Sequence, residues 1–330
     1  MKEKIMEYTY QELDQLLDAL LEKNHLPSLI SYKDTQVHYQ RKHQMRIIFI
    51  ALYRLFKAQY FYMNLLQDQL KKLKTTGPVY HELKKTRCLK NLRTYLYLSK
   101  VGLTDLAQHL NGAFDYVLCM HFAFATMLYD AAFDVPLCSK YLKDFDQFIM
   151  QRKKIESSDP YLLVFQESVD TIEQRIGSEH FDVFMSYVQI EHISQLMSRY
   201  QRSDVSISKG DLMKITFAKG GISGLALMHL FVPTMNQEQR GAIYELGAVM
   251  QLIDDISDIK EDVKIGIRTL PNQRLLSFQE LQELYYGTVN HLIDACNMDP
   301  YTPNGTLDML CWFSEIILNK RYQKLMHHVE

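Results

Sequence analysis

Apolar residues recur every three or four positions along almost the whole chain, and this helical spacing restricts the chain to all-α folds. Turn-forming residues are scarce, with only 13 glycines and 8 prolines among 330 residues. No run of alternating polar and apolar residues is bounded by turn signals, so no β-strand is predicted. We therefore predict one all-helical domain over residues 1–330. Turn-rich stretches predict breaks between helices at 75–78, 156–160, 202–210, 263–272 and 297–305.

Three predicted helices, over residues 113–134, 211–231 and 241–262, are apolar on nearly all sides for several turns. Such helices are typical of the centre of a bundle, where other helices surround them. Each of the three also carries polar residues near one end. This arrangement predicts a single large helical bundle with a central apolar cavity whose mouth is charged.

The overall composition excludes some classes of protein. The net charge of −2 argues against a nucleic-acid-binding protein, which normally carries a basic excess. The five cysteines form no CxxC pair, which is typical of reduced thiols in a cytoplasmic protein. The charged N-terminus does not resemble a signal peptide. The longest apolar stretch, 113–130, contains Asp115 and His121, so we expect a soluble, cytoplasmic protein that contacts membranes only transiently.

The most informative local pattern is QLIDDISDIKED (251–262), in which an apolar segment leads directly into a cluster of acids. On a helix, Asp254, Asp258 and Asp262 lie within an arc of roughly 80° and along roughly 12 Å of the axis. Glu261 and Gln251 lie on the same side. The opposite side carries four residues expected to pack in the core: Ile253, Ile256, Ile259 and Val263.

Closely spaced carboxylates repel one another, and two explanations of this acidic face are possible. The first is a solvated end of an amphipathic helix, but such a face normally interleaves basic residues, and here only Lys260 intervenes. The second is a divalent cation, because Mg²⁺ binds carboxylate oxygens together with water and substrate phosphates. A second acidic pair, Asp130 and Asp134, ends the helix before Pro136. We predict that the two acidic helix ends face each other and bind Mg²⁺.

These motifs resemble those of the class I isoprenoid synthases. QLIDDISDIKED is similar to the second aspartate-rich motif of squalene and phytoene synthases and to the metal-binding triad of terpene cyclases. YDAAFD (129–134) resembles the first motif, although it lacks the adjacent double aspartate of chain-elongating prenyltransferases. GGISGLALMHLF (220–231) is similar to the glycine-bearing helix beside the substrate in squalene and phytoene synthases. The resemblance covers residues 110–270, whereas the first 100 residues share only the helical character.

The resemblance implies a fold of the class I terpenoid synthase type, a cofactor and a set of site residues. The implied cofactor is Mg²⁺, as three ions bound together with the substrate diphosphate. Its ligands would be Asp130, Asp134, Asp254, Asp258, Glu261 and Asp262. The diphosphate would be bound by Lys219, Lys264, Arg268, Arg321 and Tyr322. The cavity would be lined by Phe122, Phe133, Gly221 and Gly224, although glycines also permit close packing of helices.

The implied reaction is the metal-triggered ionisation of an allylic isoprenyl diphosphate, followed by conversion of the carbocation to a terpene. The segment 263–272 is expected to close over the site and exclude water. Two alternatives remain open: a head-to-head prenyl transferase of the squalene/phytoene synthase type, and a non-catalytic helical protein that binds a prenyl lipid. The expected partners are an isoprenyl diphosphate, a membrane surface contacted transiently and a second copy of the chain.

The basic stretch KKTRCLKNLRTYLYLSK (84–100) has three interpretations. It is a solvated helix face, a contact with a membrane surface, or a supplementary contact with a diphosphate. The sequence contains no HExxH motif, no Ser-His-Asp arrangement and no glycine-rich phosphate-binding loop.

Overall fold

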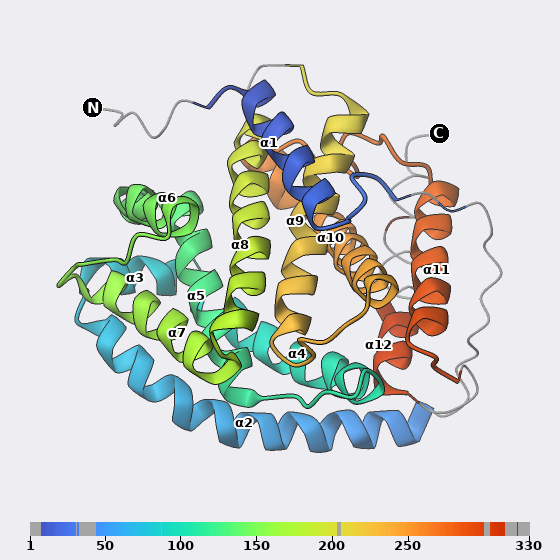
Figure 1. The fold of residues 1–330 in the computed structure, drawn as a ribbon, viewed down its shortest axis with the longest axis horizontal. Helices are drawn as coiled ribbons and strands as arrows, with labels where there is room; N and C mark the ends of the chain where they lie inside the picture. Colours follow the sequence, from blue (N-terminus) through green and yellow to red (C-terminus); the bar gives the residue numbers. More distant parts are fainter. Residues whose placement is uncertain are drawn as a thin grey trace. The chain divides into compact units, whose positions relative to one another are not determined.

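Helices make up most of the computed structural model, which describes residues 8–30, 32, 44–86, 88–202, 206–299, 304–313 and 322 (Figure 1). These residues contain no β-strand, which confirms the predicted all-α class. The elements are α1 (Tyr10–Lys23), α2 (Gln44–Lys74), α3 (Pro78–Lys85), α4 (Cys88–His109), α5 (Tyr116–Asp134), η1 (Pro136–Tyr141), α6 (Leu142–Gln151), α7 (Pro160–Ile176), α8 (Ser178–Ser198), η2 (Arg199–Arg202), α9 (Lys209–His229), α10 (Gln237–Ile265), α11 (Phe278–Ala295) and α12 (Gly305–Phe313).

Side-chain caps fix where several helices begin. The Asp115 carboxylate accepts hydrogen bonds from two backbone N–H groups in the first turn of α5, and Asp159 accepts one at the start of α7. Reciprocal capping boxes, in which the side chains at both ends of the first turn bond to backbone N–H groups, start α10 at Asn236 and α11 at Ser277. Helix α5 ends at Asp134, before Pro136, as the sequence predicted, and Pro136 opens the 3₁₀ helix η1.

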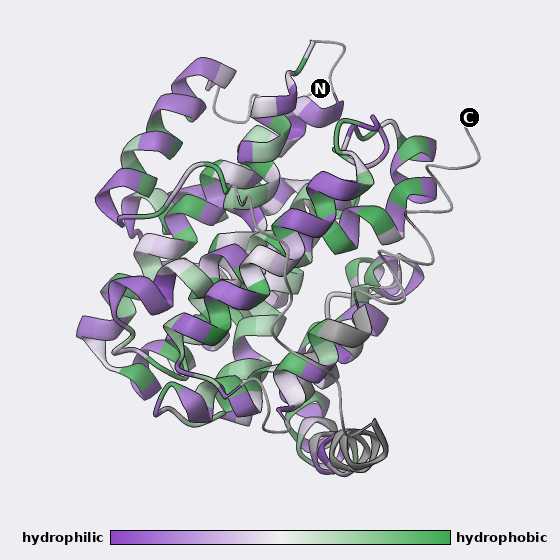
Figure 2. Cartoon of the chain, turned by 90° about the vertical axis from the view of Figure 1, so that its right-hand side faces the viewer, coloured by the Kyte–Doolittle hydropathy of each residue, from purple (hydrophilic) through white to green (hydrophobic). Residues whose placement is uncertain are grey.

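The chain divides into two compact units, each assembled from separate segments. One unit comprises residues 1–7, 45–186 and 230–233, and the other comprises residues 8–44, 187–229 and 234–330. We call them the α5 unit and the α10 unit after a central helix of each. Hydrophilic and hydrophobic residues are interleaved along the helices, as expected of helices that bury one face (Figure 2). That residues 1–330 form one domain stays a prediction.

Helix α5 lies at the centre of the α5 unit, in contact with α4, α7 and η1. Most of its side chains are buried, from Leu118 to Ala132, as the sequence predicted for this segment. Among the described helices, α5 is long and apolar enough to cross a membrane by length and composition alone. A buried core helix meets the same criterion, and 72% of the apolar window of α5 is buried within the protein.

Helices α9 and α10 form the centre of the α10 unit, where glycines bring their backbones together. A Cβ atom on Gly220 would lie 2.5 Å from the Gly247 carbonyl oxygen, and one on Gly247 would lie 2.3 Å from the Gly220 carbonyl oxygen. Neither position can carry a larger residue without moving the helices apart. Helix α11 packs against α10, and the Gly287 backbone of α11 lies against the Tyr32 ring.

Candidate functional site

The predicted acidic residues extend along about the last three turns of α10. Asp254, Asp258 and Glu261 are exposed, and Asp262 is half-buried. Together with the buried Asp255 they form what we call the α10 acid ladder. Because α10 continues without a break to Ile265, the helical spacing on which the prediction depends is present in the structure. Gly266 then ends the helix with a left-handed backbone conformation (φ 76°), which glycine adopts without strain.

Desolvation and mutual repulsion raise the pKa values of the ladder carboxylates. For Asp254 and Asp258 the pKa rises because protein atoms displace water and because a second carboxylate, Asp258 or Glu261, lies close by. The same causes raise the pKa of Asp262 to about 6, with Asp258 and Asp254 as the neighbouring charges. A cation at this face would relieve that repulsion.

Lys219 is the basic side chain that α9 brings to the acid ladder. Its charge lowers the pKa values of Asp254, Asp255 and Asp262, so the ammonium group lies near all three carboxylates. Lys219 directly precedes Gly220, the residue at which the α9 and α10 backbones meet. The close approach of the two helices therefore determines how near Lys219 lies to the acids.

Asp255 is the member of the ladder that the sequence analysis did not select. It is buried, and its carboxylate accepts a hydrogen bond of 3.0 Å from the Gln251 side-chain amide. Desolvation raises its pKa to about 7, with Asp254 and Asp262 contributing and with Gln251 and Lys219 opposing the shift. The two consecutive aspartates, Asp254 and Asp255, could have indicated that one of them is buried. Consecutive residues on a helix point 100° apart, so the two side chains cannot share one solvent-facing side.

The apolar side of α10 agrees with the prediction for its first turns only. Ile253 and Ile256 are buried, and Ile259 is half-buried. The prediction for Val263 is wrong, because its side chain is 61% exposed, and that of Ile265 is 53% exposed. The last turn of α10 thus presents apolar side chains to solvent beside the half-buried Asp262.

The second acidic pair ends α5, in the other unit. Asp130 is half-buried and Asp134 is exposed, one turn apart on the same side of the helix. Both lie near Cys88 at the start of α4, because their charges contribute to the raised pKa of that thiol after the larger effect of desolvation. That this pair faces the α10 acid ladder stays a prediction.

The other residues predicted to bind the diphosphate lie in different surroundings. Lys264 is exposed in the last turn of α10. The Arg268 guanidinium donates a hydrogen bond of 3.1 Å to the Tyr200 carbonyl oxygen, which ties segment 263–272 to η2. The Tyr322 hydroxyl is buried and donates to the Leu276 carbonyl oxygen at 2.6 Å. Tyr322 therefore anchors the chain in the α10 unit. Arg321 lies outside the described residues.

The two predicted cavity rings pack against other rings within the α5 unit. Phe122 is buried and meets Phe184 edge to face, with the ring centroids 6.1 Å apart. Phe133 is half-buried and tilts against Tyr129, with the ring centroids 5.1 Å apart. These contacts are those of a packed aromatic core.

The two predicted cavity glycines lie in the contact between α9 and α10. A Cβ atom on Gly221 would meet the Tyr244 ring at 2.6 Å, and one on Gly224 would lie 3.1 Å from the Gly247 Cα atom. The space beside both glycines is therefore filled by α10. Close helix packing, the second of the two roles considered for these glycines, accounts for them.

The basic stretch 84–100 divides into exposed residues and one buried lysine. Lys84, Lys85, Lys90 and Arg93 are exposed on α3 and α4, whereas Lys100 is only 8% exposed. The Lys100 ammonium lies 4.6 Å from the ring centroid of Phe114 and 4.4 Å from that of Tyr116. Desolvation, followed by repulsion from Arg54 and Lys57, lowers its pKa to about 8. The interpretation of the stretch 84–100 as a solvated helix face therefore does not hold at Lys100.

The donor set of the acid ladder suits a hard cation. Its ligands are carboxylate oxygens, and Mg²⁺ commonly uses only one or two of these, with water and phosphate oxygens completing the shell. No three Asp, Glu, His or Cys side chains of the described residues already converge on one point as a complete metal cage. No family model, curated protein or solved structure matches the chain.

Proposed function

We propose that the protein is a Mg²⁺-dependent class I terpene synthase that ionises an allylic isoprenyl diphosphate and converts the carbocation to a terpene. The observation that supports this most is the α10 acid ladder. Its carboxylates share one end of a central helix, have pKa values raised by desolvation and by mutual repulsion, and have Lys219 beside them. The motif resemblance in QLIDDISDIKED supplies the class of reaction.

In this proposal each part of the ladder has a separate role. Asp254, Asp258 and Asp262 would hold Mg²⁺, with Glu261 alongside, and Asp130 and Asp134 of α5 stay predicted ligands. Bound Mg²⁺ supplies Lewis-acid stabilisation of the departing diphosphate. Lys219 would place a fixed positive charge where negative charge develops. Lys264, exposed two residues beyond the ladder, would reach the diphosphate from the other side of the helix end.

The substrate chain would occupy a central apolar cavity of the bundle, which excludes water from the carbocation. Arg268 would bind the diphosphate through the guanidinium N–H donors that remain after its hydrogen bond to the Tyr200 carbonyl oxygen. Closure of that segment over the bound substrate is part of the proposal.

The test is incubation with Mg²⁺ and geranyl, farnesyl or geranylgeranyl diphosphate, with measurement of diphosphate release and of the organic product. A cyclic or rearranged terpene from one substrate supports the proposal. A product of doubled carbon number would instead support the head-to-head transferase. Absence of diphosphate release from all three substrates, together with no effect of Mg²⁺ on thermal stability, would leave the non-catalytic lipid-binding protein.

The matched variants are Asp258→Asn in the ladder and Glu238→Gln in the first turn of the same helix. Replacement of Asp258 should lower diphosphate release by at least roughly 100-fold, because even groups that only support a metal ligand are worth 10- to 100-fold. Glu238 is exposed four turns away from the ladder, so its replacement should leave release unchanged. Equal rates for the two variants would exclude the ladder as the metal site.

A further inference from the structure

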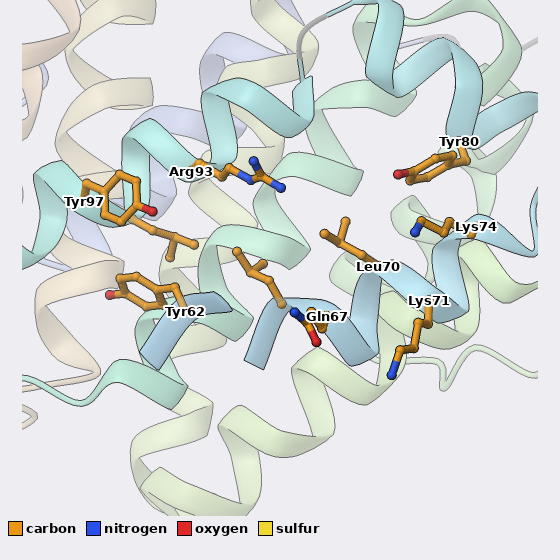
Figure 3. A pocket seen from close by; sticks show the side chains of 10 residues that line it. Tyr62, Gln67, Leu70, Lys71, Lys74, Tyr80, Arg93 and Tyr97 are labelled. Carbon is orange, nitrogen blue, oxygen red and sulfur yellow. The ribbon is translucent and has the colours of Figure 1, made fainter. Parts of the chain in front are cut away.

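A pocket of about 350 Å³ opens in the α5 unit between α2, α3 and α4 (Figure 3). None of its lining residues belongs to the α10 acid ladder or to the α5 acid pair. Its volume lies at the small end of the range of ligand sites, which suits a short-chain molecule. The described residues that line it are Tyr62, Leu66, Gln67, Leu70, Lys71, Lys74, Tyr80, Arg93, Leu96 and Tyr97.

One side of the pocket is formed by the core of the α5 unit. Leu66, Leu96 and Tyr62 are 5%, 0% and 1% exposed, respectively, so they provide an apolar surface that is already fixed by packing. Leu70 is half-buried and lies between Tyr62 and Lys74 (Figure 3). An apolar chain lying on these three leucines would displace water from their surface.

The other side of the pocket is positively charged. The described lining contains three basic residues and no acidic residue. In Figure 3 the Arg93 guanidinium, the Lys74 ammonium and the Tyr80 hydroxyl point toward the same open space beside Leu70. No ion pair joins Lys74 or Arg93 to any of the residues that the structure describes.

Lys71 differs from the other two basic residues of the lining. Its ammonium lies 3.4 Å from the Asp68 carboxylate one turn earlier on α2, and in Figure 3 it points away from Lys74 and Arg93. The positive charge directed into the pocket therefore comes from one residue of α2 and one of α4. Tyr80 of α3 adds a hydroxyl donor, so three helices contribute to one polar end.

We propose that this pocket binds a small amphipathic phosphate, a molecule with a phosphate group at one end and a short apolar chain at the other. The planar guanidinium of Arg93 can donate two parallel hydrogen bonds to phosphate oxygens, and Lys74 provides a compact second charge. Tyr80 donates to a further oxygen, while the chain lies on Leu66, Leu70 and Leu96. The site is separate from the proposed active site and does not need Mg²⁺.

Calorimetric titration with octyl phosphate below its micellar concentration, in metal-free buffer, tests this proposal. The protein should bind one octyl phosphate, whereas inorganic phosphate and octanol should bind at least about 10-fold more weakly, because each fills only one end of the site. Arg93→Ala and Lys74→Ala should each weaken binding about 10-fold or more. Since both side chains are exposed, circular dichroism should show that the variants remain folded.

Lys72→Ala is the matched control, because it removes the same charge from the same helix at an exposed residue outside the lining. Leu70→Trp is a second variant, which fills the pocket at constant charge and should also abolish binding. Failure to bind octyl phosphate, or an equal loss of affinity in Lys72→Ala and Lys74→Ala, would overturn the proposal.

A vesicle experiment separates the two sources of such a ligand. Vesicles that contain phosphatidic acid should bind the protein in an Arg93-dependent way if the phosphate belongs to a membrane lipid. If it belongs to a soluble molecule, octyl phosphate should bind while the vesicles do not. Vesicle binding that Arg93→Ala leaves unchanged would contradict the proposed site. Because neither titration uses Mg²⁺ or an isoprenyl diphosphate, their failure would leave the proposed enzyme activity untouched.

Discussion

Asp255 places a carboxyl group inside the α10 unit, where its charged form is disfavoured. Its folded-state pKa of about 7 lies above its ordinary value of 3.8. Between these values the folded protein holds a proton that the unfolded chain releases, so stability falls as the pH rises from 4 to 7. Asp255→Asn should match the parent near pH 4 and be more stable at pH 8, by on the order of 2–4 kcal/mol.

Urea denaturation in metal-free buffer at the two pH values measures this difference. The asparagine side-chain oxygen can still accept the hydrogen bond from Gln251, so the substitution changes mainly the charge. Glu156→Gln, which replaces an exposed acid between α6 and α7, should keep the parent's dependence on pH. A variant of Asp255 that is less stable than the parent at pH 8 would show that the buried charge is compensated.

Lys100 is a buried basic residue, and burial disfavours its charged form as it does that of Asp255. Its pKa falls from 10.5 to about 8, so between these values the unfolded chain binds a proton that the folded protein does not. Stability from this residue should therefore rise with pH, by about 2 kcal/mol between pH 7.5 and 9.5. Lys100→Met should remove the rise, whereas Lys84→Met at an exposed position should retain it. Thermal denaturation at both pH values measures the effect, and a rise that persists in Lys100→Met would contradict this interpretation.

The sequence predicted the exposed acids better than the buried charges. Asp254, Asp258 and Asp262 follow from helical spacing alone, because α10 is continuous. The burial of Asp255 and Lys100 depends on which neighbouring helix covers them. The aromatic rings beside Lys100 come from residues 114 and 116, after the turn that follows α4. Helical spacing can be read from a single sequence, whereas the contact of Lys100 with these two rings cannot.

At the scale of helices, the contact between α9 and α10 makes a direct prediction. In Gly247→Ala the new methyl group would lie 2.3 Å from the Gly220 carbonyl oxygen, so the helices must separate. Urea denaturation should show a loss of about 1–3 kcal/mol, as for other overpacked interiors. Gly241→Ala in the same helix meets nothing closer than 3.9 Å and should gain about 0.5–1 kcal/mol from helix propensity. Effects of the same sign at both glycines would contradict the close packing.

Helix ends were predictable where a local signal marks them. Pro136 marks the end of α5, as predicted, whereas the predicted start at residue 113 is three residues too early, because Asp115 caps the helix. The predicted start of α10 at residue 241 is wrong, because the capping box at Asn236 begins the helix earlier. Val263 was predicted to be buried from its position on the apolar side. Apolar periodicity identifies a face of a helix, but not how far a neighbouring helix extends along it.

At the scale of the whole molecule, the chain path couples the two units. The α5 unit includes residues 230–233, which lie in the sequence between α9 and α10 of the other unit. Within the α5 unit, Phe231 is buried against Phe114, with the ring centroids 4.8 Å apart. If the α5 unit unfolds, residues 230–233 lose their packing. The end of α9 and the start of α10, which these residues connect, then lose a fixed connection. We expect the two units to unfold in one cooperative transition.

Phe231→Ala tests this coupling, because the single tryptophan, Trp312, lies in α12 of the α10 unit. The substitution removes a buried ring of the α5 unit and should cost about 3–5 kcal/mol. Trp312 fluorescence and far-ultraviolet circular dichroism, which reports helices of both units, should shift to lower urea together. Phe56→Ala on α2, where the ring is 72% exposed, should shift neither signal. Cooperative unfolding requires the two signals to change at the same urea concentration. If part of the circular dichroism signal is lost at lower urea while Trp312 fluorescence keeps the parent midpoint, the units unfold independently.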